Sequence, residues 1–220
     1  MTEILLIRHG ETAWNAIRRL QGHLDIPLNT EGEKQAAALG RSLASTKLDA
    51  VFSSDLQRAR QTASAIAAHH RLPVQTDAGL RERCYGAFEG MLYAEISERY
   101  PQDFAAWKAR DIDARFPPGV HVAETMREFA TRTIDAIQRV ASEARKNDCR
   151  RIAMVAHGGV LECAYRAALK MDFAQERTFD IFNASVNRFA WDGEELKLLQ
   201  WGDVSHLAKL DAGALDEVAR

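Results

Sequence analysis

One stretch organises this chain: residues 4–12, which read ILLIRHGET. Its first four residues are apolar, and such a run predicts a strand that is buried on both faces of a sheet. The run leads directly into Arg8 and His9, two polar residues that are not typical of a strand in the core. In an open α/β sheet, ligands bind beyond the carboxyl ends of the strands, so an arginine beside a histidine there predicts an anion site, with phosphate the leading ligand. Taken alone, the pair fits equally well a snorkelling arginine and a buried histidine with ordinary hydrogen bonds.

The composition is that of an ordinary globular protein. The chain has 220 residues, of which 46% are hydrophobic and 27% charged, and this length fits one large domain or two small ones. Its 29 basic and 31 acidic residues leave a net charge of −2, which predicts neither nucleic acid nor an anionic membrane as a partner. Cys84, Cys149 and Cys163 lack C-x-x-C spacing, which fits reduced thiols. With no apolar run long enough to span a bilayer and no room for a signal peptide before the first strand, we expect a cytoplasmic protein.

Apolar periodicity and turn residues predict alternating strands and helices along the rest of the chain. The predicted strands are 48–52, 73–76 and 152–156, with a terminal hairpin of 185–191 and 196–201 around Asp192-Gly193. The predicted helices are 31–45, a helix from Ser54 to about 70, 92–99, 101–109, 123–146 and one after 159. Capping boxes that begin at Thr30 and Ser54 are expected to open the first two helices. No repeat or linker interrupts the chain, which favours one domain over residues 1–220 with a helical lid inserted at about 92–122 and a tail in the last dozen residues.

A second apolar strand, 152–156, also ends on a histidine, His157. If the two strands are parallel, His9 and His157 lie at the same edge of the sheet. Arg58 falls in the first turns of a helix that follows a strand, a position that favours anions. Arg8, Arg58 and His157 could therefore surround a phosphoryl group while His9 attacks the phosphorus, an arrangement that needs no metal.

Glu82, in the loop that follows residue 78, is the candidate acid for the leaving oxygen. A phosphate dianion beside it would favour its protonated form, while neighbouring cations would oppose this. A general acid contributes about 10²–10⁴ in rate, so Glu82→Gln should impair departure of the leaving group more than phosphate binding. In isolation the residue also fits a solvated glutamate in a charged loop.

Five blocks of sequence occur in order between residue 3 and about residue 206. They are LIRHGET (6–12) with Asn15; QG (21–22) with Asp25, Pro27-Leu28 and Gly32; SSDL (53–56) with RA (58–59) and TA (62–63); LRE (80–82) with YG (85–86) and EG (89–90); and VAHGG (155–159). Together they closely resemble the histidine phosphatase superfamily, phosphoglycerate-mutase-like branch. A lone R-H-G is a weak signal, whereas five blocks in order are a strong one.

The resemblance implies a three-layer αβα sandwich of the phosphoglycerate-mutase-like type, with a mixed, mostly parallel sheet, and it implies neither a cofactor nor a metal. Its site residues carry over position by position. His9 matches the phosphohistidine nucleophile, Glu82 the general acid, Arg8, Arg58 and His157 the phosphate pocket, Asn15 a further polar contact, and Gln21-Gly22 a wall on the substrate side.

Members of this family either return the phosphoryl group to a bound product, as mutases, or pass it to water, as phosphatases. The cofactor-dependent mutases have a longer basic insertion between the acid loop and the second histidine, whereas here only 74 residues separate Glu82 from His157. They also have HGNS at the second histidine, where this chain has HGGV. Both departures favour a phosphatase. The run from Glu82 to Gly86 is somewhat mutase-like. We expect a metal-independent phosphomonoester hydrolase of the histidine acid-type class, acting on a small phosphorylated metabolite through a phosphohistidine, with a cofactor-dependent phosphoglycerate mutase as the alternative.

Other classes fit less well. No cysteine is followed by arginine at the C-x₅-R spacing of cysteine-based phosphatases, and a P-loop would need glycine at position 15 and lysine at 16. A non-catalytic phosphate- or phosphopeptide-binding module is the competitor from another class. The substrate is not named by the sequence, and a homodimer is compatible with it. Six residues of the lid segment are candidates for substrate contact, although each also fits a structural role: Tyr93, Trp107, Phe116, His121, Glu124 and Thr125.

Overall fold

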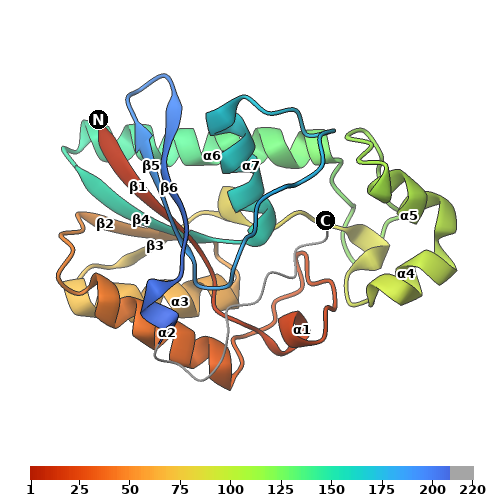
Figure 1. Cartoon of the computed structure of the whole chain (residues 1–220), viewed down its shortest axis with the longest axis horizontal. Helices are drawn as coiled ribbons and strands as arrows, with labels where there is room; N and C mark the ends of the chain where they lie inside the picture. The colour runs from red at the N-terminus through yellow and green to blue at the C-terminus, as the bar shows by residue number, and fades with distance from the viewer. Residues whose placement is uncertain (209–220) are drawn as a thin grey trace.

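The computed structural model describes residues 1–208, and its centre is a sheet of six strands (Figure 1). The strands are β1 (Thr2–Arg8), β2 (Ala50–Ser53), β3 (Val74–Thr76), β4 (Arg151–Ala156), β5 (Val186–Trp191) and β6 (Leu196–Asp203), in the spatial order β3-β2-β4-β1-β5-β6. The pairs β2/β3, β2/β4 and β1/β4 are parallel, whereas β5 runs antiparallel to both β1 and β6. The prediction of a mixed, mostly parallel sheet is confirmed.

Helices cover both faces of this sheet (Figure 1). One face carries α2 (Thr30–Leu43) and α3 (Gln57–His70), and the other carries α6 (Met126–Lys146) and α7 (Gly158–Leu169). The remaining helical segments are α1 (Ala13–Ala16), α4 (Tyr93–Arg99), α5 (Pro101–Lys108) and the short 3₁₀ turns Ala78–Leu80, Gly86–Phe88 and Ser205–Leu207. This is the expected three-layer αβα sandwich.

Strand β1 is the axis of the core because both of its faces are buried. Ile4 and Leu6 pack into the apolar cluster under α6 and α7, whereas Leu5 and Ile7 pack into the cluster under α2 and α3. Successive side chains of a strand point to opposite faces, so four apolar residues in a row suit a strand with a helical layer on each side. Residues 4–7 thus form a strand that is buried on both faces, as their apolar run predicts.

The register of β1 and β4 decides where the site lies. Arg8 is opposite Ala156 in this parallel pair, and these two residues are the last of their strands. His9 and His157 therefore leave the sheet side by side at its carboxyl edge. The expectation that two parallel strands deliver both histidines to one place is confirmed.

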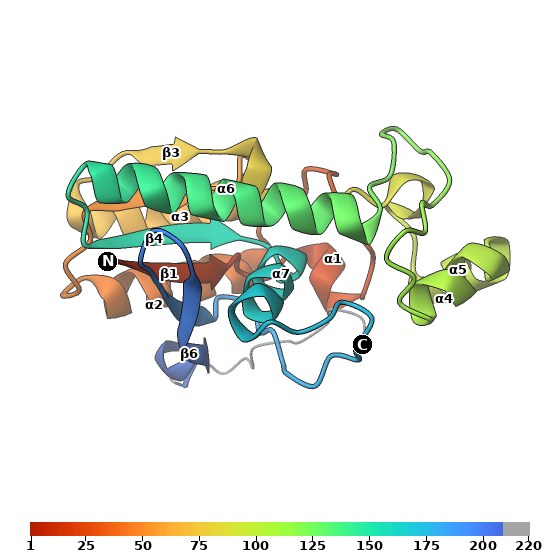
Figure 2. The same ribbon diagram turned by 90° about the horizontal axis from the view of Figure 1, so that it is seen from above.

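Residues 92–122 contain α4 and α5, which lie to one side of the sandwich, beyond the end of α6 (Figure 2). They pack on a separate apolar cluster that includes Phe88, Ile96 and Phe116 and has Trp107 against it. The rings of Phe88 and Phe116 are stacked, with their centroids 4.5 Å apart. Because this cluster does not merge with the two clusters of the sheet, the segment has packing of its own.

Three helix starts differ from the prediction. Asn29, not Thr30, caps α2, since its side chain accepts a hydrogen bond from the Gly32 N–H; an asparagine one residue earlier serves the same orphan donors. Ser54 does not cap α3, which begins at Gln57 after Leu56 and has no side-chain cap. Helix α6 begins at Met126 rather than at 123, because Thr125 and Glu128 form a capping box there.

The terminal hairpin is present, but its turn is longer than the Asp192-Gly193 pair predicts. Strand β5 ends at Trp191 and β6 begins at Leu196. The Asp192 carboxylate accepts hydrogen bonds from the N–H groups of Glu194 and Glu195, which stabilises a four-residue connection instead of a two-residue turn.

Two further expectations concern the ends and the membrane. No helix within residues 1–208 has the length and apolarity needed to cross a membrane. The tail predicted for the last dozen residues coincides with residues 209–220, which lie outside the described part of the chain.

Candidate active site

His9 is held as a neutral imidazole with one free nitrogen. Its Nδ1 lies 2.6 Å from the carbonyl oxygen of Gly10. A carbonyl oxygen only accepts, so Nδ1 carries the proton and the lone pair is on Nε2. The residue is 3% exposed. Burial, with the charges of Arg58 and Arg8 in addition, lowers the pKa of His9 well below its usual 6.5, which leaves Nε2 available as a nucleophile at neutral pH.

His157 lies against His9 and is fully buried. The two rings meet edge to face with their centroids 5.2 Å apart. Neither ring nitrogen of His157 has a hydrogen-bond partner among residues 1–208. Burial first, and then the charge of Arg58, lowers the pKa of His157 well below its usual 6.5. A buried donor without a partner is costly, so this ring is suited to the oxygen of a bound ligand.

Two buried guanidinium groups complete the cationic part of the site. Arg58, in the first turn of α3, donates to the carbonyl oxygens of Leu24 and Gly22, each at 2.9 Å. Its Nε has no hydrogen-bond partner within the described chain. Burial lowers the pKa of Arg58 to about 10, so the group remains charged at neutral pH. Arg8, at the end of β1, is also buried and donates to the carbonyl oxygen of Ile181 at 2.6 Å.

Glu82 is positioned by two backbone N–H groups from different parts of the chain. Its Oε1 accepts from Arg83 at 2.8 Å, and its Oε2 accepts from Gly159, in the first turn of α7, at 3.0 Å. A Cβ atom on residue 159 would lie 2.2 Å from Oε1 and 2.9 Å from the Phe129 ring. The absence of a side chain at position 159 therefore allows the carboxylate to reach its place.

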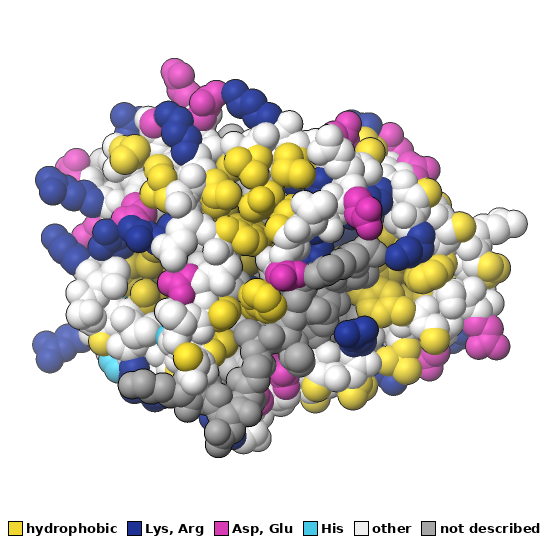
Figure 3. All heavy atoms as spheres, in the orientation of Figure 1, with side chains coloured by type: hydrophobic (Ala, Val, Ile, Leu, Met, Phe, Trp, Pro, Cys, Tyr) yellow, Lys and Arg dark blue, Asp and Glu magenta, His cyan; other side chains and the backbone are white. Residues whose placement is uncertain are grey.

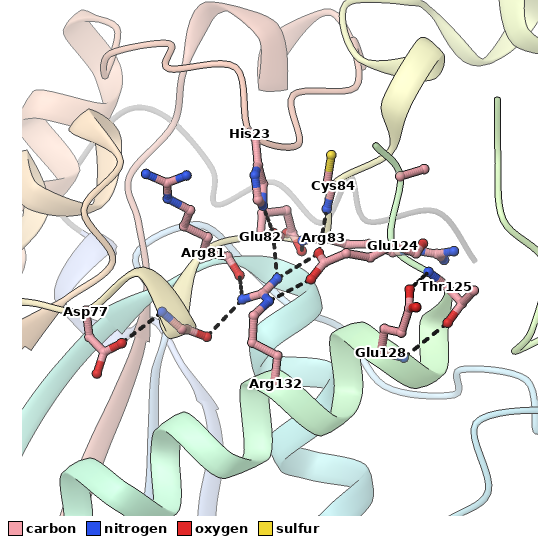
Figure 4. A network of polar contacts seen from close by, with 12 residues as sticks. His23, Asp77, Arg81, Glu82, Arg83, Cys84, Glu124, Thr125, Glu128 and Arg132 are labelled. Carbon is pink, nitrogen blue, oxygen red and sulfur yellow. Dashed lines mark hydrogen bonds and ion pairs between the residues drawn. The ribbon is translucent and has the colours of Figure 1, made fainter. Parts of the chain in front are cut away.

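An ion pair that the sequence did not reveal holds the segment around Glu82 (Figure 4). Arg132 of α6 binds both carboxylate oxygens of Glu124, at 2.7 and 2.8 Å. The same guanidinium donates to three loop carbonyls, those of Gly79, Arg81 and Glu82, at 2.9, 3.1 and 3.2 Å. Because Arg132 is one arginine on the polar side of a long amphipathic helix, nothing in the sequence separates it from its neighbours.

Asn15 and Gln21 are joined through Thr12. The Thr12 N–H donates to Oδ1 of Asn15 at 2.9 Å, and the Thr12 hydroxyl lies 3.0 Å from Oε1 of Gln21. The amide oxygens are engaged in these contacts, so the NH₂ groups remain as donors for a ligand. His23, two residues on, has its Nε2 2.8 Å from the carbonyl oxygen of Glu82, a contact that the sequence also did not reveal.

One cavity of about 1070 Å³ brings most of the predicted site residues together. Seven of the eight predicted site residues line it: Arg8, His9, Asn15, Gln21, Gly22, Arg58 and Glu82. His157 is not in the wall and lies beside His9, where its edge contact places it.

The far side of the cavity is aromatic and comes largely from residues 92–122. Of the six residues proposed for substrate contact in or next to that segment, Tyr93, Trp107 and Phe116 line the cavity, whereas His121, Glu124 and Thr125 do not. In the space-filling view, hydrophobic side chains gather on the side of the molecule where α4 and α5 lie, with basic side chains next to them (Figure 3). The site thus combines a cationic end with an apolar end, which suits an anionic group attached to a less polar body.

Comparisons with known proteins agree with this geometry. A family model described as histidine phosphatase superfamily (branch 1) matches residues 4–204. The chain is 40% identical over 208 residues to phosphoglycerate mutase-like protein 4 of Arabidopsis thaliana, covering 93% of this chain and 86% of the relative. It is 35% identical over 212 residues to a metal-independent phosphoserine phosphatase of the same plant, covering 96% and 85%. Among solved structures, Bacillus stearothermophilus YhfR superposes with a TM-score of 0.82 at 30% identity, over 94% of this chain and all of that one.

Proposed function

Since this chain belongs to the histidine phosphatase superfamily, we propose that it hydrolyses a small phosphomonoester without a metal, through a phosphohistidine at His9. The observation that carries the proposal is the state of His9: a neutral ring with its Nε2 lone pair free, next to Arg8 and Arg58 and in one cavity with Glu82. Donors of this kind neutralise phosphoryl oxygens, and phosphoryl transfer depends mainly on such positioning and charge.

In the first step, His9 Nε2 attacks phosphorus and the bond from phosphorus to the ester oxygen breaks. Arg8, Arg58 and His157 donate to the non-bridging oxygens, with Asn15 as a further contact. Protonated Glu82 gives its proton to the departing oxygen, so that the product leaves as an alcohol.

In the second step, the Glu82 carboxylate takes a proton from water as the water oxygen attacks phosphorus. The bond from phosphorus to Nε2 breaks, which frees inorganic phosphate and returns His9 to its neutral form. Glu82 is protonated again, so the cycle closes with one water consumed.

Hydrolysis is favoured over phosphoryl return by the sequence around the second histidine. Gly159 stands where the cofactor-dependent mutases have asparagine. A Cβ atom at position 159 would lie 2.2 Å from Glu82 Oε1, so there is no space for a side chain there. One curated relative is a metal-independent phosphoserine phosphatase, which supports a small metabolite as substrate. The three cysteines are free thiols, which agrees with a cytoplasmic enzyme.

Trapping the intermediate tests the proposal. Brief incubation with a ³²P-labelled phosphoester should label the protein in an acid-labile, base-stable form, and turnover should be unchanged in EDTA. The label should be absent from His9→Ala. Label that persists in this variant would refute the assignment, and a strict metal requirement would refute the mechanism.

Product analysis separates the alternatives. With 3-phosphoglycerate, a phosphatase releases inorganic phosphate, whereas a mutase yields 2-phosphoglycerate and depends on the 2,3-bisphosphate. A binding module gives neither product. A panel of phosphorylated metabolites, assayed for released phosphate, then identifies the substrate.

A further inference from the structure

We propose that Cys84, Glu89 and His121 form a binding site for a divalent zinc-type metal ion, outside the catalytic cavity. Cys84 Sγ, a Glu89 carboxylate oxygen and a ring nitrogen of His121 all lie within 4.8 Å of one another. The Nδ1 of His121 is 3.7 Å from Oε2 of Glu89. In a tetrahedral zinc site the ligand atoms are about 3.3–3.6 Å apart, so small side-chain shifts would complete the geometry.

Glu89 presents an unused oxygen to this cluster. Its Oε1 accepts from the N–H groups of His23 and Tyr85, at 2.9 and 3.0 Å. Its Oε2, in a side chain that is only 3% exposed, makes no contact of full hydrogen-bond geometry within the described residues, and the groups that interact with this carboxylate there are the Cys84 thiol and the His121 ring. A buried carboxylate oxygen with only weak or distant donors is poorly compensated, and a cation at this point would improve its compensation.

Of the other two ligands, Cys84 lies on a fixed segment and His121 is accessible to solvent. The Cys84 N–H donates to Oε2 of Glu124, whose carboxylate is fixed by Arg132, so the thiol sits on a braced segment. The His121 side chain is 48% exposed, which gives the ion a path from solvent and leaves space for a water as fourth ligand.

The two segments that supply the ligands are already in contact without an ion. The Ala87 N–H donates to the Pro117 carbonyl oxygen at 2.8 Å. A Cβ atom on Gly119 would lie 2.6 Å from the backbone of Gly86, so the turn before His121 packs directly on the turn after Cys84. The ion would therefore link two segments that already pack against each other, and it would not need to bring them together.

The donor set indicates which ion binds. One thiolate, one imidazole and one carboxylate match zinc and its spectroscopic substitute cobalt, whereas calcium and magnesium prefer oxygen ligands throughout. Burial raises the pKa of the Cys84 thiol to about 11, so the ion must release this proton to solvent as it binds. The site lies next to the segment of Glu82, but its ligands do not line the catalytic cavity; the ion therefore braces the acid-bearing loop and takes no part in turnover.

Cobalt titration of the untagged, EDTA-treated full-length protein tests the site without any activity assay. We expect a thiolate-to-cobalt charge-transfer absorption that saturates at one equivalent and is abolished by zinc. Cys84→Ser and His121→Ala should lose this absorption, whereas Cys149→Ser, which removes a thiol outside the cluster, should keep it. His121→Ala decides the question if Cys84→Ser does not fold, because His121 is half exposed.

Thermal unfolding gives an independent measurement. Zinc at about 100 times its dissociation constant should raise the unfolding midpoint by about 5–10 °C in the wild type and leave His121→Ala unchanged. Absence of the cobalt absorption in the wild type, or its persistence in His121→Ala, would overturn the site. Neither result touches the phosphohistidine, whose own test is the labelling of His9.

Discussion

The carboxylate of Glu82 accepts a hydrogen bond from the backbone N–H of Gly159 at 3.0 Å. The contact joins the loop that carries the proposed acid to the first turn of the helix that follows His157. Because the N-terminus of a helix attracts negative charge, the start of this helix also holds the Glu82 carboxylate in place after Glu82 has given up its proton.

Gly159→Ala should lower kcat by about 10²-fold and change KM little, because the new Cβ would lie 2.2 Å from Glu82 Oε1 and displace the acid but not the phosphate donors. Steady-state kinetics on an alkyl phosphomonoester measure this. In a Glu82→Gln background the same substitution should have almost no further effect. Additive losses in the double variant would show that Gly159 acts by another route.

Glu82→Gln should slow alkyl phosphate esters by about 10²–10⁴-fold and affect p-nitrophenyl phosphate much less, since a good leaving group needs little help from an acid. The ratio of the two rates is the measurement. Equal losses on both substrates would mean that Glu82 supports binding rather than proton transfer.

Arg132→Lys should reduce kcat roughly tenfold at nearly constant KM, because a lysine cannot bind both oxygens of Glu124 and three loop carbonyls at once. The loss should be larger on alkyl than on aryl esters, as for Glu82 itself. Arg139→Lys, on the same helix and paired with Asp77 at the surface, is the matched control. A loss confined to KM would contradict a positioning role.

The acid limb of kcat/KM should lie well below pH 6.5. The nucleophile must be neutral, and burial lowers the pKa of His9, so the reactive form persists as the solution becomes acidic. The pH profile in the free enzyme measures this directly. A fall in kcat/KM centred at pH 6.5 or above would contradict the buried, neutral His9.

The stability of the fold should depend on pH through His9 and His157. The pKa values of His9 and His157 are lowered in the folded chain, so the unfolded chain binds more protons below pH 6.5. Their contribution is therefore complete above about pH 6.5 and is lost as the pH falls, by up to about 1.4 kcal/mol per pH unit for each ring. Urea unfolding between pH 7 and pH 5.5 measures the slope, which His157→Asn should reduce by about half.

Much of the fold follows from the sequence. Four apolar residues in a row at Ile4 to Ile7 identify a strand with helices on both sides, since only such a strand has no polar face. The five ordered blocks identify the superfamily, and the type of each residue at the strand ends indicates phosphate chemistry. The helix starts are less exact for two reasons. Asn29 and Thr30 compete for the same orphan N–H groups of α2, and α3 begins after Leu56 with no side-chain cap, although Ser54 stands nearby in the sequence.

Only the tertiary structure decides how the site residues support one another. The His9 tautomer depends on the Gly10 carbonyl, and the place of Glu82 depends on Gly159 and on Arg132, which are far away along the chain. The same holds for the cluster of Cys84, Glu89 and His121, whose residue types and spacing form no motif. Hydrogen bonds and metal geometry depend on distances between atoms of different segments, and those distances are set when the layers pack, not by the local pattern of residues.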